Sequence, residues 1–389
     1  MISSNNPFNK KHLKQGMAML IITAASFTAC KPGGGSTTTT DSTAAVTQTT
    51  DTLTGGTPNS LKPTGPKPVW APSIKPQMQA VLEKLASYHD KPIPQLNAAE
   101  ARKNHTPNDA VMAIMKENNI AVPVLKVDTM GKDIPVTGGH IRLRIYTPQG
   151  SEGPFPVIVY YHGGGFVIAD LDVYDASAKS LADQVGAVVV SVAYRMAPEM
   201  KFPTAHNDSF EAYQWVVKNA ASIKGDPKMI AVAGESAGGN LAANMAIMAR
   251  DKGIMAPKHV LSVYPIASAD MFSPSYNKYI DAKPLDKAMM MWFAKIYTNN
   301  LAEVKDPRLN LLAANLKGLP PFTIINAELD PLQSDGEMLA TKLKAAGVIV
   351  NHKLYNGVTH EFFGMGAIVP DAKDAMDYAA SQLKSAFKK

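Results

Sequence analysis

Apolar residues along this chain follow two different periods. Residues 155–161 (FPVIVYY) form an unbroken apolar run, which is typical of a strand buried on both faces of a sheet. In residues 140–146 the apolar side chains alternate with polar ones, which is the period of a strand with one solvated face. Residues 74–89 carry apolar side chains at helical spacing instead: Met78, Val81, Leu82 and Leu85. The chain therefore combines strands with amphipathic helices.

Strand and helix signals alternate over most of the chain from residue 155 onward. The predicted strands are 122–127, 140–146, 155–161, 187–193, 229–233, 259–264, 322–327 and 348–355. The predicted helices are 74–89, 109–117, 174–185, 208–221, 240–250, 286–297, 337–346 and 371–387. Strands separated by helices of this length imply βαβ crossovers and a mostly parallel sheet, so the predicted fold class is α/β. The interval 265–319 is too long for a plain crossover, and we expect a helical insertion there.

The strand at 229–233 leads into the helix at 240–250 through the sequence Gly-Glu-Ser-Ala-Gly. A Gly-x-Ser-x-Gly turn between a strand and a helix is the mark of the nucleophile in α/β-hydrolases. So tight a turn needs small neighbours, which Gly234 and Gly238 supply. Ser236 would then stand beside the helix N-terminus, where backbone N–H groups favour developing negative charge. Taken alone, the motif is also compatible with a glycine-rich loop that carries an incidental serine.

Two further residues follow strands in the places where partners for a serine are expected. A serine hydroxyl becomes a strong nucleophile when a base accepts its proton and an acid orients that base. In parallel sheets such groups lie at the carboxyl ends of the strands. Asp330 follows the strand at 322–327 and is the predicted acid, with Glu328 as its competitor. His360 follows the last strand and is the predicted base, and the order Ser236, Asp330, His360 is that of α/β-hydrolases.

A glycine-rich loop, HGGGF, follows the predicted strand 155–161 directly. Gly163, Gly164 and Gly165 allow backbone N–H groups to come close to a ligand, which suits donors aimed at a tetrahedral oxyanion. The backbone N–H of Ala237 would be a further donor. For the histidine at position 162 we expect a structural role in the loop and not proton transfer.

Five motifs in this order resemble the hormone-sensitive-lipase-like branch of bacterial esterases and lipases. They are HGGGF at 162–166, YRMAPE at 194–199 with Phe202-Pro203 after it, GESAGG at 234–239, DPL at 330–332 and the loop of His360. The resemblance as a whole covers about residues 70–389. It implies an α/β-hydrolase fold with a mostly parallel, eight-stranded sheet flanked by helices. It also implies a helical cap, which we place at about 70–120 and 265–300 within a catalytic domain at 68–389.

The resemblance also implies roles for single residues. It makes Gly164, Gly165 and Ala237 the oxyanion donors and gives Glu199 a structural role. The sequence departs from the usual motifs at three positions: Glu235 replaces Asp or Thr, Ser334 stands where an acid is common, and Glu361 stands where Gly is common. None of these departures alters the predicted catalytic residues, so they bear on substrate preference and not on the chemistry.

The first 29 residues have the organisation of a secretory signal. A positive patch at 10–14 precedes an uncharged, mostly apolar stretch at 17–29, which is too short to span a bilayer. The stretch ends in Phe-Thr-Ala before Cys30, the single cysteine of the chain. A cysteine after small residues resembles the lipobox of bacterial lipoproteins, so we expect lipidation of Cys30. An ordinary cleaved signal is the alternative.

Residues 30–67 would then form the anchor cysteine and a tether. This segment is rich in Gly, Ser, Thr and, toward its end, Pro, and it has little apolar surface to bury. We therefore expect an exported cell-envelope protein that is held at a membrane by its N-terminal lipid. With no other cysteine, the exported domain would be stable without disulfides.

Composition limits the partners that need to be considered. The net charge of +6 falls to +3 without the three lysines of the leader, with 36 basic against 33 acidic residues. We find no basic stripe with interleaved aromatics, so nucleic acid is not an expected partner. No zinc-ligand spacing or phosphate-binding loop occurs, and the sequence implies no metal and no organic cofactor.

The sequence thus predicts a serine carboxylic-ester hydrolase that acts on small-molecule esters. A preference for short or medium acyl chains is implied by the resemblance alone. An amidase, a lactonase or a peptidase would use the same machinery and is an open alternative. A non-catalytic binding protein on the same fold is a further alternative, against which the presence of Ser236, Asp330 and His360 argues.

Overall fold

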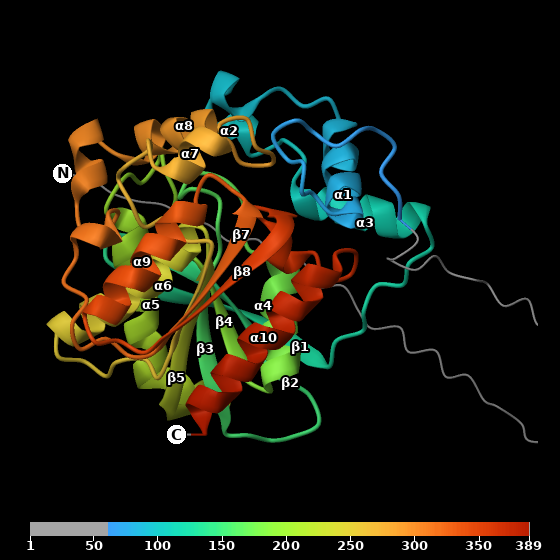
Figure 1. Cartoon of the computed structure of the whole chain (residues 1–389). Helices are drawn as coiled ribbons and strands as arrows, with labels where there is room; N and C mark the ends of the chain where they lie inside the picture. The colour runs from blue at the N-terminus through green and yellow to red at the C-terminus, as the bar shows by residue number, and fades with distance from the viewer. Residues whose placement is uncertain (1–60, 389) are drawn as a thin grey trace, which may run out of the picture. The chain divides into compact units, whose positions relative to one another are not determined.

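The computed structural model describes residues 61–388, and an eight-stranded sheet forms its centre (Figure 1). The strand order is β1-β2-β4-β3-β5-β6-β7-β8. Strand β2 runs antiparallel to both β1 and β4, whereas β3 to β8 are parallel. The bounds are β1 Val127–Val136, β2 Gly139–Pro148, β3 Phe155–Tyr161, β4 Val188–Ala193, β5 Gly225–Glu235, β6 Val260–Val263, β7 Phe322–Leu329 and β8 Val350–Thr359. The predicted α/β class and mostly parallel sheet are confirmed.

Both faces of the sheet are buried, as the unbroken apolar run of β3 predicts. Val157 and Val159 belong to one hydrophobic cluster. The alternate residues Ile158 and Tyr160 belong to another. All four side chains are almost fully buried. The alternation follows from the two-residue period of a strand, so a continuous apolar sequence gives a sheet that needs helices on both sides.

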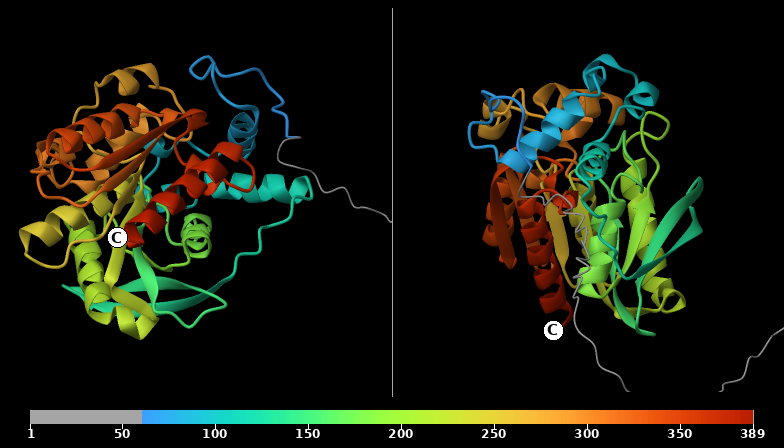
Figure 2. Two further views of the ribbon diagram at one scale, coloured as in Figure 1. Left: turned by 60° about the horizontal axis from the view of Figure 1, so that its bottom comes forward. Right: turned by 90° about the vertical axis from the view of Figure 1, so that its right-hand side faces the viewer.

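Helices cover the two faces (Figures 1 and 2). Helices α4 and α10 contribute to the same cluster as Ile158, whereas α5, α6 and α9 contribute to the cluster of Val157. The helices are α1 Pro76–Ala86, α2 Ala98–Ala101, α3 Pro107–Glu117, α4 Asp175–Val185, α5 Thr204–Asn219, α6 Ala237–Asp251, α7 Pro274–Lys278, α8 Lys287–Tyr297, α9 Gln333–Ala345 and α10 Pro370–Phe387. No helix within residues 61–388 is long and apolar enough to cross a membrane.

Five of these helices, α1, α2, α3, α7 and α8, lie beyond one end of the sheet, and we call them the cap helices (Figure 1). They belong to the segments 70–120 and 265–300, in which a cap is expected. The two segments meet where the Trp292 indole N–H donates to the carbonyl of Leu96 at 3.0 Å. The first segment is tied to the main sheet by the Lys75 N–H, which donates to the carbonyl of Gly357 at 2.9 Å.

One predicted strand is wrong. Residues 122–126 form no strand, and β1 begins only at Val127, at the end of the predicted segment. Val122 and Val124 are exposed, and Pro123 between them has no N–H to give to a sheet. Strand β1 itself is mostly exposed and polar because it is an edge strand, paired with β2 alone. Its sequence therefore lacks the apolar alternation of a strand with one buried face.

The predictions for the N-terminal leader, for Cys30 and for most of the tether lie outside the described residues. The last part of the expected tether, residues 61–67, is described and packs against α1. The Thr64 and Gly65 N–H groups donate to the carboxylate of Glu83 at 2.6 and 3.0 Å, and Leu61 is buried. The packed part of the chain thus includes residues that composition alone assigns to the tether.

Candidate active site

Ser236 stands on the turn between β5 and α6. Its backbone has φ +58° and ψ −117°, a strained conformation for a residue with a side chain. The turn leaves no room beside it. A Cβ on Gly234 would lie 2.2 Å from the carbonyl oxygen of Gly238, and a Cβ on Gly238 would lie 1.9 Å from that of Tyr161. Both glycines of the motif are therefore required by sterics, as the sequence predicts.

The structure brings the three predicted catalytic side chains together. The His360 Nε2 lies 2.9 Å from the Ser236 Oγ, and its Nδ1 lies 2.7 Å from the Asp330 Oδ2. Since a carboxylate only accepts, Nδ1 carries the proton and Nε2 presents its lone pair to the serine hydroxyl. The competing acid, Glu328, lies elsewhere and accepts hydrogen bonds from the Gly357 N–H and from a serine of the cap segment.

The surroundings of His360 favour its protonation. All three side chains are buried, with Asp330 fully inaccessible. Burial favours the neutral imidazole, but the charge of Asp330 and its hydrogen bond outweigh that effect, with smaller contributions from Glu361 and Glu235. The pKa of His360 is therefore raised above its ordinary value. A base of this kind accepts a proton from a serine more readily than a free histidine does.

The glycine loop lies beside the serine. Gly164 and Gly165 have φ of +94° and +60°, which glycine adopts without strain. Among the described residues, no backbone carbonyl accepts from the N–H of either glycine. Ala237 is the first residue of α6, where an N–H has no partner inside the helix. These three N–H groups are therefore available to a ligand.

Two further residues of this loop, His162 and Gly163, have structural contacts. His162 is buried, and its Nδ1 donates to the carbonyl of Gly163 at 2.8 Å. Burial lowers the pKa of His162 to about 4, so it is neutral, which agrees with the structural role that we expect for it. Gly163 has no room for a side chain, because a Cβ there would lie 2.2 Å from the Tyr174 hydroxyl.

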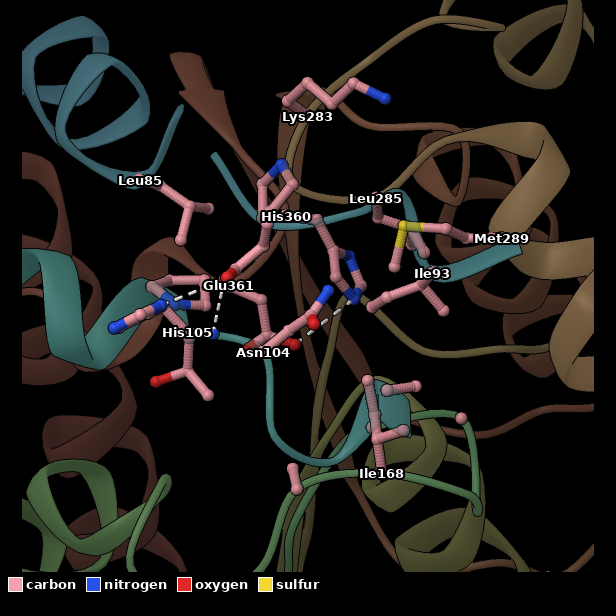
Figure 3. Close-up of a pocket in the computed structure, with 18 of the residues that line it drawn as sticks. Leu85, Ile93, Asn104, His105, Ile168, Lys283, Leu285, Met289, His360 and Glu361 are labelled. Carbon is pink, nitrogen blue, oxygen red and sulfur yellow. Dashed lines mark hydrogen bonds and ion pairs between the residues drawn. The ribbon is translucent and has the colours of Figure 1, made fainter. Parts of the chain in front are cut away.

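A cavity of about 810 Å³ opens over Ser236 and His360 (Figure 3). It lies between the sheet and the cap helices, and both of the loop glycines Gly164 and Gly165 line it. Much of the remaining wall is apolar: Leu82, Leu85, Ile93, Ile168, Leu285, Met289, Met290 and Phe293. The arrangement places a nucleophile, a base and free N–H donors at the wall of an apolar cavity, as acyl transfer requires.

Comparison with known proteins agrees with this geometry. The family described as having the alpha/beta hydrolase fold matches residues 158–364, which is more than half of the chain. The carboxylesterase NlhH of Mycobacterium tuberculosis is 41% identical over 260 residues, which are 66% of this chain and 79% of the relative. The ethyl acetate hydrolase of Pseudomonas putida is 31% identical over 313 residues, 78% of this chain and 96% of the relative. The chain belongs to the hormone-sensitive-lipase-like family of carboxylesterases.

Solved structures of similar esterases show the same fold. A thermostable esterase from Pseudomonas putida has a TM-score of 0.75 and 34% identity, and the match covers 82% of this chain and 98% of that one. A hyperthermophilic esterase from the archaeon Pyrobaculum calidifontis has a TM-score of 0.73 and 36% identity over 80% of this chain and 98% of that one. The α/β-hydrolase fold expected from the motifs is confirmed.

Glu235, the unusual residue beside the serine of this esterase, points away from the cavity into the core. It is buried, and the hydroxyls of Tyr160 and Tyr264 donate to its two oxygens. Burial and the nearby Glu361 raise the pKa of Glu235 to about 7, against these two hydrogen bonds. The ring of Tyr264 packs on that of His360, with 4.5 Å between the centroids. Glu235 thus holds a ring that supports the histidine.

Glu361, the other unusual residue next to the site, lies in the cavity wall beside His360 (Figure 3). Its Oε1 accepts from the Tyr174 hydroxyl at 2.6 Å and lies 3.8 Å from the His360 Nε2. The sequence shows that both glutamates are unusual, but it shows no partner for either. The tyrosines that donate to these glutamates lie far away along the chain, so spacing carries no signal of those hydrogen bonds.

Proposed function

We propose that this esterase cleaves carboxylic esters through an acyl-enzyme on Ser236, with His360 as the base and Asp330 as the group that orients it. The hydrogen-bonded series from the Asp330 Oδ2 through His360 to the Ser236 Oγ is the observation that carries the proposal. In this arrangement His360 takes the hydroxyl proton as Ser236 attacks the acyl carbonyl. The same histidine then returns the proton to the leaving alcohol, and water resolves the acyl-enzyme by the reverse use of these groups.

We assign the oxyanion hole to the N–H groups of Gly164, Gly165 and Ala237, as the family resemblance suggests. Negative charge forms on the acyl oxygen in the transition state, and fixed donors at the wall of an apolar cavity stabilise that charge. The positive end of α6, which begins at Ala237, acts in the same direction. The sequence also suggests Gly163 as a donor. The need for a glycine at this position is explained by the Tyr174 hydroxyl, which leaves no room for a side chain.

For the substrate we propose esters with short or medium acyl chains. The name of the ethyl acetate hydrolase among the relatives supports this preference, and the apolar wall of the cavity suits an acyl chain. The Phe293 ring crosses over Gly165, with ring atoms 2.3 Å from where a Cβ would stand, and limits the room beside the loop. Long acyl chains would have to displace this ring.

Removal of the nucleophile or of the base tests the mechanism. Ser236→Ala and His360→Ala should each lower kcat on p-nitrophenyl butyrate by on the order of 10⁶, since these residues act as a unit. Ser151→Ala, at an exposed loop position, is the matched control and should keep the rate of the unchanged enzyme. A rate in Ser236→Ala equal to that of the unchanged enzyme would rule out the proposal.

A substrate panel tests the preference. We expect kcat/KM for nitrophenyl esters to be highest for acetyl to octanoyl groups and to fall steeply toward the palmitoyl ester. We also expect the butyryl ester to react much faster than the butyryl nitroanilide and than a small lactone. A faster amide or lactone would replace the esterase assignment by one of those activities on the same catalytic residues.

We also propose that the protein is exported and is held at a membrane by a lipid on Cys30. The support is sequence alone: the positive patch, the apolar stretch and the single cysteine after small residues. Cells that produce the full chain should incorporate labelled palmitate into it, and globomycin should block its processing. Label that persists in Cys30→Ala would disprove this anchor.

A further inference from the structure

We propose that Glu361 is a positioning residue for the reaction: its carboxylate stabilises the imidazolium that His360 becomes when it takes the proton of Ser236. The inference rests on the proposed function, because it gives Glu361 a part in that mechanism. It goes beyond the three catalytic residues and assigns a task to a side chain that the usual motif of this family lacks.

The backbone at Glu361 is the first observation. Its φ is +68°, in the left-handed region where a side chain costs about 1 kcal/mol or more and where glycine is at ease. A charged residue at such a position, directly after the base, is an outlier of the kind that gathers at functional sites. The strain by itself does not identify a role, but it directs attention to the side chain.

The side chain is the second observation. Its Oε1 lies 3.8 Å from the His360 Nε2, the atom that is hydrogen-bonded to the Ser236 Oγ. The Tyr174 hydroxyl donates to the same oxygen at 2.6 Å and holds the carboxylate in place. Tyr174 is buried against Gly163 of the glycine loop and is itself fixed. The hydrogen bond from Tyr174 therefore fixes the carboxylate beside the nitrogen that takes the proton.

Two acids then face the two nitrogens of one imidazole. Asp330 accepts from Nδ1 at 2.7 Å, and Glu361 faces Nε2. In the attack step the O–H bond of Ser236 breaks, a bond from its Oγ to the acyl carbon forms, and Nε2 gains the proton. The carbonyl electron pair moves to the oxygen in the oxyanion hole. The new positive charge on His360 is absent from the ground state, so its attraction to Glu361 lowers the barrier.

Other titratable groups also face this pair. The ring of Tyr264 packs on His360, and the charge of Glu235 acts on the same histidine. The Tyr174 hydroxyl contacts Glu361. The remaining ionisable residues of the cavity wall are His89, Asp90, Lys91, Arg102, His105, Asp170, Lys283 and Asp286. Burial raises the pKa of Glu361 above its ordinary value, while His360 and the Tyr174 hydrogen bond act against that rise. Of the ionisable residues of the wall within the described part of the chain, Glu361 is the one with a carboxylate within 4 Å of a His360 ring nitrogen.

A purely structural role makes different predictions. Glu361 would then serve to hold Tyr174 and the histidine loop, and an uncharged acceptor of the same shape would do this equally well. Glu361→Gln keeps an oxygen for the Tyr174 hydroxyl and removes the charge, so it separates the two roles. Glu361→Gly removes the contact as well, and it relieves the backbone strain.

The experiment measures kcat and KM against pH with p-nitrophenyl butyrate for both variants and for Glu152→Gln, a matched change at an exposed position. We expect both Glu361 variants to lose about tenfold in kcat on the alkaline plateau, with KM within twofold of the unchanged enzyme. The acid limb of kcat/KM should move to lower pH in both, because His360 loses a charge that raises its pKa. Glu152→Gln should match the unchanged enzyme.

Two results would overturn the inference. One is a Glu361→Gln enzyme with unaltered kcat and an unaltered acid limb. The other is a loss of activity in Glu361→Gly alone, which would reduce Glu361 to a packing role. Neither result would affect the proposed function, which is tested separately by the loss of activity in Ser236→Ala and His360→Ala.

Discussion

Gly238 lies directly against the backbone of the neighbouring strand β3. A Cβ at this position would be 1.9 Å from the Tyr161 carbonyl oxygen and 2.6 Å from that of His162. Both atoms belong to the backbone that leads into the glycine loop, so they cannot move without moving that loop. One glycine thus links the position of Ser236 to the position of the oxyanion donors.

We expect Gly238→Ala to damage both stability and catalysis. The extra methyl group should lower the free energy of unfolding by roughly 1–3 kcal/mol and shift the loop that carries the donors. Urea unfolding and kcat/KM on a butyryl ester measure the two effects. Gly366→Ala is the control, since a Cβ there meets nothing closer than 3.6 Å. Equal stability and activity in the two variants would contradict the tight packing of the turn.

Glu235 predicts a pH dependence of stability. Burial raises its pKa to about 7 from an ordinary value of 4.5, so between these values the folded protein holds a proton that the unfolded chain has released. The free energy of unfolding of the protein therefore falls as the pH rises through this window, by about 3 kcal/mol in all. Between pH 4.5 and 8 the free energy of unfolding of Glu235→Gln should rise by that amount relative to the unchanged protein. Urea unfolding measures this difference. A difference between the two proteins that does not vary with pH would contradict the burial of an ionisable carboxyl.

At the scale of elements, the site is a property of strand ends. Ser236, Asp330 and His360 follow β5, β7 and β8, which are parallel strands in one sheet, so their carboxyl ends meet at one edge. This is why the three residues could be predicted from sequence order. The edge strand β1 could not be predicted, because its exposure removes the apolar signal. The hydrogen bonds of Glu235 and Glu361 with tyrosines could not be predicted either, because those tyrosines are distant in sequence.

Phe293 of helix α8 should influence the acyl-chain preference of the enzyme. Phe293 is buried, and its ring lies over Gly165 in the cavity wall. Phe293→Ala should lower the free energy of unfolding by about 3 kcal/mol and should raise the relative kcat/KM for longer acyl chains, since it enlarges the cavity. Phe272→Ala is the control, because that ring is 75% exposed. An unchanged chain-length profile in Phe293→Ala would place the acyl group elsewhere in the cavity.

At the scale of the whole molecule, cap helices and sheet form one cavity from two distant parts of the chain. Arg102, next to α2, pairs with Glu199 through two hydrogen bonds of 2.8 Å and also donates to the carbonyls of Val167 and Ala197. The cap is thus attached close to the glycine loop. The composition of the cap segments predicts helices but not this attachment, because no local pattern encodes a contact between residues so far apart in sequence.

The same cavity gives access to the nucleophile, and this permits the most direct test of the central claim. Ser236 should attack an organophosphate such as a diethyl nitrophenyl phosphate, form a bond from its Oγ to phosphorus and release nitrophenolate. We expect activity to fall in step with one diethylphosphoryl group per chain, found by mass spectrometry on the peptide that contains Ser236 and absent from His360→Ala. Complete inactivation with Ser236 unlabelled, or with the label on another residue, would contradict Ser236 as the nucleophile.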